Sequence, residues 1–246
     1  MRSMTRRDAS VQVPDLSEFR AFGTLARSST TLEVRWIDLG SVPEAMVAWL
    51  GPFDDWIERR EDRYLVDPSV SDLGIKIKDA VQFDLKAFRG SLGRLEVPGA
   101  GRGHLELWEK WSFPLHASAL PPADAAGWLA LEKTRRRRSF EVGEDEAMER
   151  PMTRAEQPGC SVELTEVAVG GERWWTLGIE ATGGRETLER NLRATAKKVF
   201  RGPSPVPALL DLGSSMSYPQ WLYSHGYLRR HLARPVRDEV GMEDLG

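Results

Sequence analysis

The feature that most constrains the fold is a series of extended segments, several of them visibly alternating, most of them separated by Gly, Pro or Asp. This pattern is typical of strands joined by short turns. It favours an α+β fold dominated by an antiparallel sheet, and closing that sheet into a β-barrel would remove its exposed edges. The expected strands are Thr31–Trp36, Arg63–Val66, Gly74–Lys78, Gln82–Phe88, His104–Phe113, Leu129–Val142, Ser161–Val169 and Trp174–Ala181.

Helices are expected at the periphery of the sheet. Ser41 and Glu44 have the spacing of a capping box, which predicts a helix over 42–50. A second short helical piece is expected at Asp54–Arg60. The strongest helix prediction is 186–200, where apolar residues share one face and a Gly-Pro pair follows.

The chain is expected to divide into a polar N-terminal arm (1–30), a barrel domain (31–202) and a C-terminal extension (203–246). Trp221 and Leu222 indicate an amphipathic helix in the extension. Packing of the extension on its own barrel is the default expectation. Its aromatic residues leave open a contact with a partner or a homodimer.

Composition limits the location and the partners. A net charge of -3 gives no general reason to expect a nucleic-acid partner. The single cysteine, Cys160, cannot form an internal disulfide, and no Cys/His cluster has zinc spacing. The first 30 residues contain no apolar stretch suited to a signal peptide, and no uncharged apolar run has membrane length. The expected location is therefore cytoplasmic, with no membrane partner.

Charged residues gather on one face of the expected strands. Lys76 and Lys78 share a face, opposite Ile75 and Ile77, because successive side chains of a strand point to opposite sides. Such faces either line a wet cavity inside a barrel or form the solvated outer faces of a sandwich. The spacing alone does not choose between the two.

A series of short motifs adds to this pattern. In chain order they are Thr31-x-Glu33-x-Arg35, Asp62-x-Tyr64, Ile75-Lys76-Ile77-Lys78, Asp84-x-Lys86, Glu106-x-Trp108-Glu109, Lys133-x-Arg135, Leu164-Thr165-Glu166-Val167 and Gly178-Ile179-Glu180. Their order over residues 31–200 resembles that of the CYTH, or triphosphate tunnel, superfamily. The resemblance implies an eight-stranded antiparallel tunnel that binds triphosphates or other polyphosphates, usually with a divalent metal.

A triphosphate carries several negative charges and no apolar group, so binding it requires many Lys and Arg donors aimed at one place. The candidate phosphate-binding residues are Arg35, Lys76, Lys78, Lys86, Lys110, Arg135 and Arg137. The candidate ligands of Mg²⁺ or Mn²⁺ are Glu33, Glu106, Glu163 and Glu180. The candidate catalytic residues are Glu33, Glu180 and Lys133.

Three positions depart from the family pattern. Thr31, Thr165 and Gly178 stand where the family places acids, and each change removes a candidate metal ligand or water activator. The predicted function is binding of a phosphorylated small molecule in a cationic tunnel, with metal-dependent phosphoanhydride hydrolysis as the enzyme hypothesis. The alternatives are a binding module that has lost catalysis and a scaffold for protein interactions.

Overall fold

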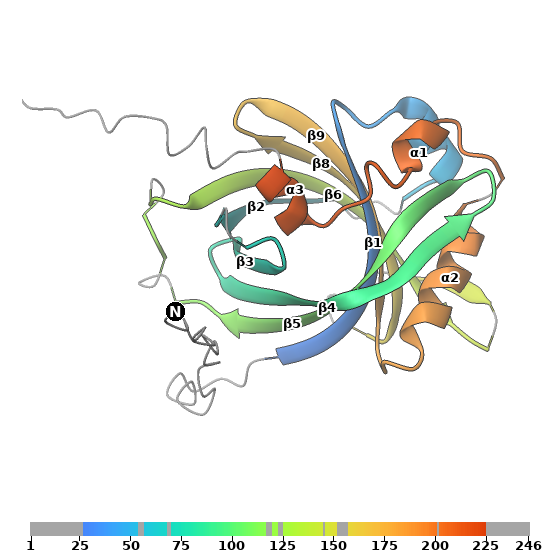
Figure 1. The fold of residues 1–246 in the computed structure, drawn as a ribbon, viewed down its shortest axis with the longest axis horizontal. Coiled ribbons are helices and arrows are strands. Elements are labelled where there is room, and N and C mark those ends of the chain that lie inside the picture. The colour runs from blue at the N-terminus through green and yellow to red at the C-terminus, as the bar shows by residue number, and fades with distance from the viewer. Residues whose placement is uncertain are drawn as a thin grey trace, which may run out of the picture.

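The computed structural model of the chain describes residues 27–53, 57–67, 70–116, 120–122, 125–144, 146–151, 157–200 and 202–224. Nine strands, three α-helices and one 3₁₀ helix (η3) make up the described part (Figure 1). The elements are β1 (Arg27–Leu39), α1 (Glu44–Leu50), β2 (Ile57–Leu65), β3 (Leu73–Lys78), β4 (Gln82–Val97), β5 (Gly101–Pro114), β6 (Trp128–Val142), β7 (Ala147–Arg150), β8 (Gly159–Val169), β9 (Glu172–Thr182), α2 (Leu188–Val199), η3 (Pro207–Leu210) and α3 (Tyr218–Ser224).

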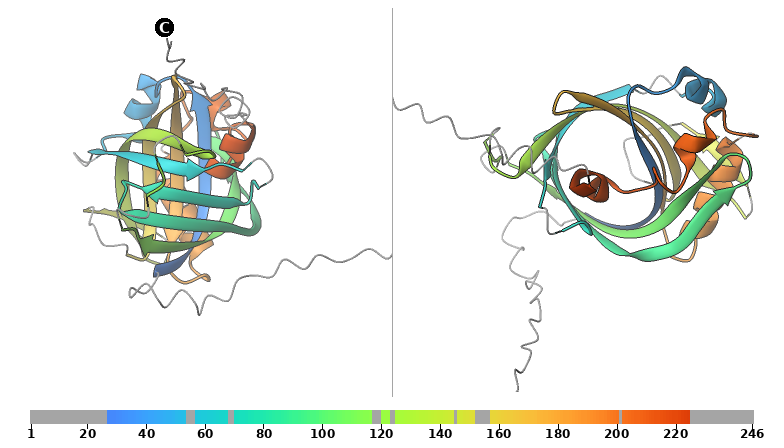
Figure 2. Two further views of the ribbon diagram at one scale, coloured as in Figure 1. Left: turned by 90° about the vertical axis from the view of Figure 1, so that its left-hand side faces the viewer. Right: turned by 45° about the horizontal axis from the view of Figure 1, so that its top comes forward.

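Eight of the nine strands form a closed antiparallel barrel (Figure 2). The strand order is β2-β3-β4-β5-β1-β9-β8-β6, and pairing of β2 with β6 closes the ring. The short strand β7 pairs with the far end of β6 and stands outside the ring. The predicted α+β class and antiparallel barrel are therefore confirmed. Closure pairs the strand edges that an open sheet would expose.

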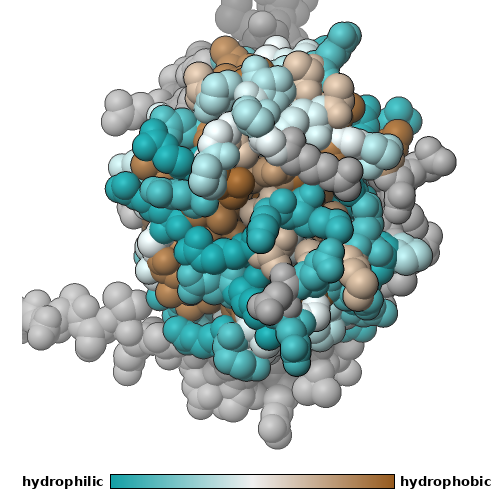
Figure 3. Space-filling model, turned by 90° about the vertical axis from the view of Figure 1, so that its right-hand side faces the viewer, coloured by the Kyte–Doolittle hydropathy of each residue, from teal (hydrophilic) through white to brown (hydrophobic). Residues whose placement is uncertain are grey.

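The main apolar core lies on the outer side of the barrel wall. In β1, Leu32, Val34 and Trp36 are buried in this core, whereas the intervening Glu33 and Arg35 line the inner cavity. The amphipathic helix α2 covers the outer face of β1, β8 and β9 (Figure 1). It confirms the helix predicted over 186–200. Seen from the side of α1 and α2, the molecular surface is mostly hydrophilic, with small separate apolar patches (Figure 3).

Helix α3 occupies one mouth of the barrel (Figure 2). Trp221 and Leu222 are buried there against inward-facing apolar residues that include Ile37, Leu131 and Trp174. The lumen is therefore charged in one part and apolar where α3 sits. The expected packing of the extension on its own barrel is confirmed for residues 203–224, and the later part of the predicted C-terminal helix lies outside the described residues.

Several boundaries differ from the prediction. The short helix expected at Asp54–Arg60 is wrong: residues 57–60 begin β2, which pairs with β6, and residues 54–56 lie outside the described part. The segment has few apolar residues to reveal a strand period, since its inward positions are charged. Strand β1 begins at Arg27, before the expected Thr31.

Gly103 in β5 permits a close approach between the wall and its outer core. A Cβ atom added there would meet Val34 and would lie 2.8 Å from Trp36 Cζ2. Gly103→Ala is therefore expected to lower the free energy of unfolding by about 1–3 kcal/mol, as overpacked cores do. Gly143→Ala is the matched control, because the nearest atom to its added Cβ is 3.9 Å away. Equal stabilities of the two variants in urea denaturation would contradict this account.

Candidate functional site

A cavity of about 160 Å³ lies inside the barrel. Nine cationic and four acidic side chains line it, drawn from all eight strands of the barrel, together with residues at the start of α3. The charged lining residues are Glu33, Arg35, Arg60, Lys76, Lys78, Asp84, Lys86, Lys110, Lys133, Arg135, Arg137, Glu163 and Glu180.

Every residue predicted to bind phosphate or to act in catalysis lines this cavity. The strand period explains the convergence, because alternate residues of each strand point inward. Of the predicted metal ligands, only Glu106 is absent from the lining. It lies next to the cavity, where its Oε2 accepts a hydrogen bond of 3.1 Å from Trp108 Nε1.

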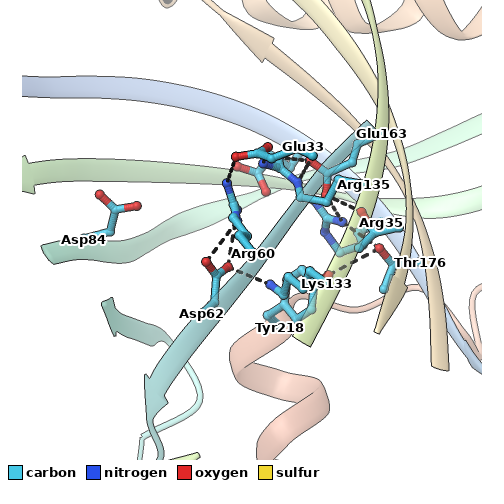
Figure 4. Close-up of polar contacts among 12 residues, drawn as sticks. Glu33, Arg35, Arg60, Asp62, Asp84, Lys133, Arg135, Glu163, Thr176 and Tyr218 are labelled. Carbon is cyan, nitrogen blue, oxygen red and sulfur yellow. Dashed lines mark hydrogen bonds and ion pairs between the residues drawn. The ribbon is translucent and has the colours of Figure 1, made fainter. Parts of the chain in front are cut away.

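Asp62 holds three of the nine cationic side chains that line the cavity (Figure 4). Its fully buried carboxylate lies 2.9 Å from Lys133 Nζ, 3.2 Å from Lys76 Nζ and 3.0 Å from Arg60 Nε. Burial acts to raise the pKa of Asp62, but the charges of Lys133, Lys76 and Arg60 outweigh it and hold that pKa far below its ordinary value. Asp62 is therefore ionised and fixes three cations around the cavity.

Arg135 is held between two acids, Glu58 and Glu163. Its Nη1 donates a hydrogen bond of 2.6 Å to Glu58, and its Nε donates one of 3.0 Å to Glu163. Burial acts to lower the pKa of Arg135, but Glu163 and Glu58 outweigh it and raise the pKa. These contacts fix the direction of the guanidinium group within the lumen.

Lys133 is buried between aromatic rings from the wall and from α3. Its Nζ lies 3.8 Å from the ring centroid of Tyr218 and 3.0 Å from the hydroxyl oxygen of Tyr64, and Tyr218 also lies under the Arg35 guanidinium at 4.9 Å (Figure 4). Burial acts to lower the pKa of Lys133, but Asp62 outweighs it and the pKa is raised. Lys133 therefore stays protonated at neutral pH and provides positive charge, not a base.

Positive charge is in excess around Lys78. Burial lowers the pKa of Lys78, and the nearby charge of Arg60 lowers it further. Burial also lowers the pKa of Lys76, although Asp62 opposes the shift. Within the part of the chain that the structure describes, Lys78 and Arg137 have no acidic partner within ion-pair distance, and Arg137 Nε is buried without a hydrogen-bond acceptor. The two side chains are available to an anion.

Three glutamates lie side by side on neighbouring strands. Glu33 in β1 is directly opposite Glu106 in β5 and Glu180 in β9. Burial and the charge of Glu33 raise the pKa of Glu180, and burial raises that of Glu106. Burial acts in the same direction on Glu33, but Lys86 and Arg35 outweigh it and lower its pKa.

The donor set for a metal is weak. Among the described residues, no group of three or more His, Cys, Asp or Glu side chains is placed to hold a metal ion. Glu163 is engaged by Arg135 and Glu33 by Lys86, so two of the four predicted ligands already have cationic partners. The residues therefore do not fit a ready-made Mg²⁺ or Mn²⁺ site, and the cofactor stays a prediction.

Sequence reasoning missed Arg60 as a cavity residue, and it considered Tyr218 only for packing over one mouth of the tunnel or for a partner contact. Arg60 was assigned to a helix, although Glu58, Arg60 and Asp62 recur with the strand period of two that would have identified it. Tyr218 reaches the cavity through the docking of α3, a long-range contact that no local sequence pattern signals.

No protein-family model matches the chain, and no curated protein matches its sequence. The resemblance to the triphosphate tunnel superfamily therefore stays a prediction.

None of the described helices is both long enough and apolar enough to cross a membrane. The cytoplasmic location and the homodimer also stay predictions.

Proposed function

We propose that the protein binds a small phosphorylated anion, such as a triphosphate, a short polyphosphate or a nucleotide, in the lumen of its barrel. The observation that carries the proposal is the excess of nine cationic over four acidic side chains around one cavity inside the barrel. The cations remain in excess when Glu58, Asp62 and Glu106, which lie beside them, are added. A polyphosphate matches this set because it offers many charged acceptors and no apolar group.

The burial of the lining side chains inside the barrel favours the same ligand class. Charges interact more strongly in a cavity of low dielectric constant than in water. The lowered pKa values of Lys76 and Lys78 mean that a bound anion would stabilise their charged forms. The order of the sequence motifs, which resembles that of the triphosphate tunnel superfamily, supports the proposal independently of the cavity.

Hydrolysis of a phosphoanhydride is the second candidate function. The raised pKa of Glu180 favours it, because such a carboxyl group exchanges a proton nearer to neutral pH than an ordinary glutamate does. In that scheme Lys133 would stabilise negative charge on the reacting phosphate. A binding module without catalysis, or a scaffold for other proteins, needs no such acid.

Thermal unfolding with sodium tripolyphosphate tests the proposal. A ligand that binds only the folded state at about 100 times its Kd adds about 2.7 kcal/mol of stability, so the Tm should rise by several degrees. Sodium sulfate at equal ionic strength is the control for general salt effects. Phosphate released in the same samples would distinguish the hydrolase from the binding module.

Two lysine variants locate the binding. Lys78→Met, which removes an inward-facing charge, should lower the affinity about ten-fold, whereas Lys198→Met, on the outer surface, should bind like the wild type. A protein whose Tm is unchanged by tripolyphosphate, pyrophosphate and nucleoside triphosphates would contradict the proposal.

A further inference from the structure

The row of three glutamates could in principle attract a divalent cation. Glu33 faces Glu106 on one side and Glu180 on the other. The Cβ atom of Glu33 is therefore expected to lie about 5 Å from the Cβ atom of each neighbour. Carboxylate oxygens are the ligands that Mg²⁺ prefers. Whether a metal is needed here depends on whether other side chains already neutralise these carboxylates.

A lysine contacts the central glutamate directly. Lys86 Nζ is ion-paired with Glu33 Oε1, the same oxygen that accepts a hydrogen bond of 2.8 Å from Thr31. The ammonium group also lies 5.4 Å from the centroid of the Trp108 ring. Lys86 comes from β4, so it reaches Glu33 across the lumen side of β5. A positive charge thus stands where the acids would otherwise hold a cation.

An arginine fills the neighbouring space. Gly178 is the inward-facing position next to Glu180 in β9, and a Cβ atom added there would lie 2.8 Å from Arg35 Cζ. No carboxylate side chain fits at 178 while the guanidinium group is in this place. Arg35 is fixed by a hydrogen bond of 3.0 Å to Thr176 and by an ion pair of 3.5 Å with Glu163. Its charge is permanent, because guanidinium does not lose its proton in proteins.

We propose that the lumen binds its polyanion without a divalent cation, because Lys86 and Arg35 provide the positive charge that a metal would bring. The inference rests on the proposed function and sets its ionic requirement. Mg²⁺ in solution then competes with the protein for the phosphate oxygens. Added Mg²⁺ should therefore weaken binding of a polyphosphate, whereas a metal-dependent site would need it.

Isothermal titration with sodium tripolyphosphate, in excess EDTA and in excess MgCl₂, tests the inference. Binding is expected in EDTA, with a weaker apparent affinity in MgCl₂. Lys86→Met keeps an apolar side chain of similar length but removes the charge, so the affinity in EDTA should fall about ten-fold. Lys86→Arg should keep most of the affinity, and the outer-surface variant Lys198→Met should match the wild type.

The outcomes separate the two proposals. Binding that requires MgCl₂ would overturn this inference and leave the proposed function intact. Lys86→Met that binds like the wild type in EDTA would also overturn it. Absence of binding in both buffers would defeat the proposed function, and this inference with it. If Lys86→Met fails to fold, the comparison of the two buffers with the wild type decides alone.

Discussion

Asp62→Ala is expected to lower the free energy of unfolding by about 3–5 kcal/mol, the usual effect of removing one partner from a buried ionic network. The carboxylate is fully buried and is the common partner of Lys133, Lys76 and Arg60. Without it, three cations remain close together in a lumen that already holds excess positive charge. Urea denaturation with linear extrapolation measures the loss.

The acidic neighbour of Asp62 provides the control. Glu61 is exposed and pairs with Arg63 on the outer side of β2, so Glu61→Ala should change stability by less than about 0.5 kcal/mol. A loss of stability below about 1 kcal/mol for Asp62→Ala would contradict the proposed role of Asp62 as the common partner of Lys133, Lys76 and Arg60.

The difference in stability between the wild type and Asp62→Ala should depend on pH in a defined direction. Asp62 has a lowered pKa in the folded state, so its contribution is complete above its unfolded pKa of about 3.9 and is lost as the pH falls through the folded value. The difference in stability between the wild type and Asp62→Ala should therefore be constant from about pH 5 to pH 8 and shrink only in stronger acid. A difference that disappears between pH 5 and pH 8 would assign the stabilisation to another group.

Trp221→Ala is expected to lower the free energy of unfolding by about 3–5 kcal/mol, because it removes the largest buried side chain of α3. The indole is fully buried and packs edge-on against Trp174, with ring centroids 5.2 Å apart, and against Tyr218 at 5.9 Å. The substitution leaves a cavity in the apolar mouth of the barrel. Chemical denaturation is again the measurement.

The same helix offers a matched control for Trp221. Tyr223 is 51 % exposed, so Tyr223→Ala removes an aromatic ring from α3 without opening a buried cavity. Its effect should stay within about 0.5 kcal/mol. If Trp221→Ala were as stable as Tyr223→Ala, the docking of α3 would contribute little to the folded barrel.

Local patterns predicted the strands that carry the site. The alternation of Ile75, Lys76, Ile77 and Lys78 places both lysines on one face of any extended strand, and the structure turns that face inward. What alternation could not decide is which face is inside. Leu32, Val34 and Trp36 would suit a conventional apolar interior, but α2 provides an apolar surface outside the wall. That choice depends on an element far away in the sequence.

The sequence did not predict which charged side chains pair with one another inside the barrel. Asp62 was recognised only as part of a short motif, yet its three cationic contacts come from its own strand, from β3 and from β6. Likewise, the approach of Arg35 over Gly178 depends on the register between β1 and β9. Such contacts follow from strand pairing, and one sequence does not specify the pairing order.

The position of β1 in the ring has a consequence for how the chain is made. This strand is the first of the described strands in chain order, but it pairs with β5 and with β9, which ends at Thr182. A ribosome must therefore synthesise the chain as far as β9 before β1 can be paired on both edges, and α2 emerges later still to shield Leu32 and Val34. Contacts so distant in sequence slow folding and leave apolar surface open to aggregation. Production of the protein should benefit from slow synthesis at low temperature or from added chaperones.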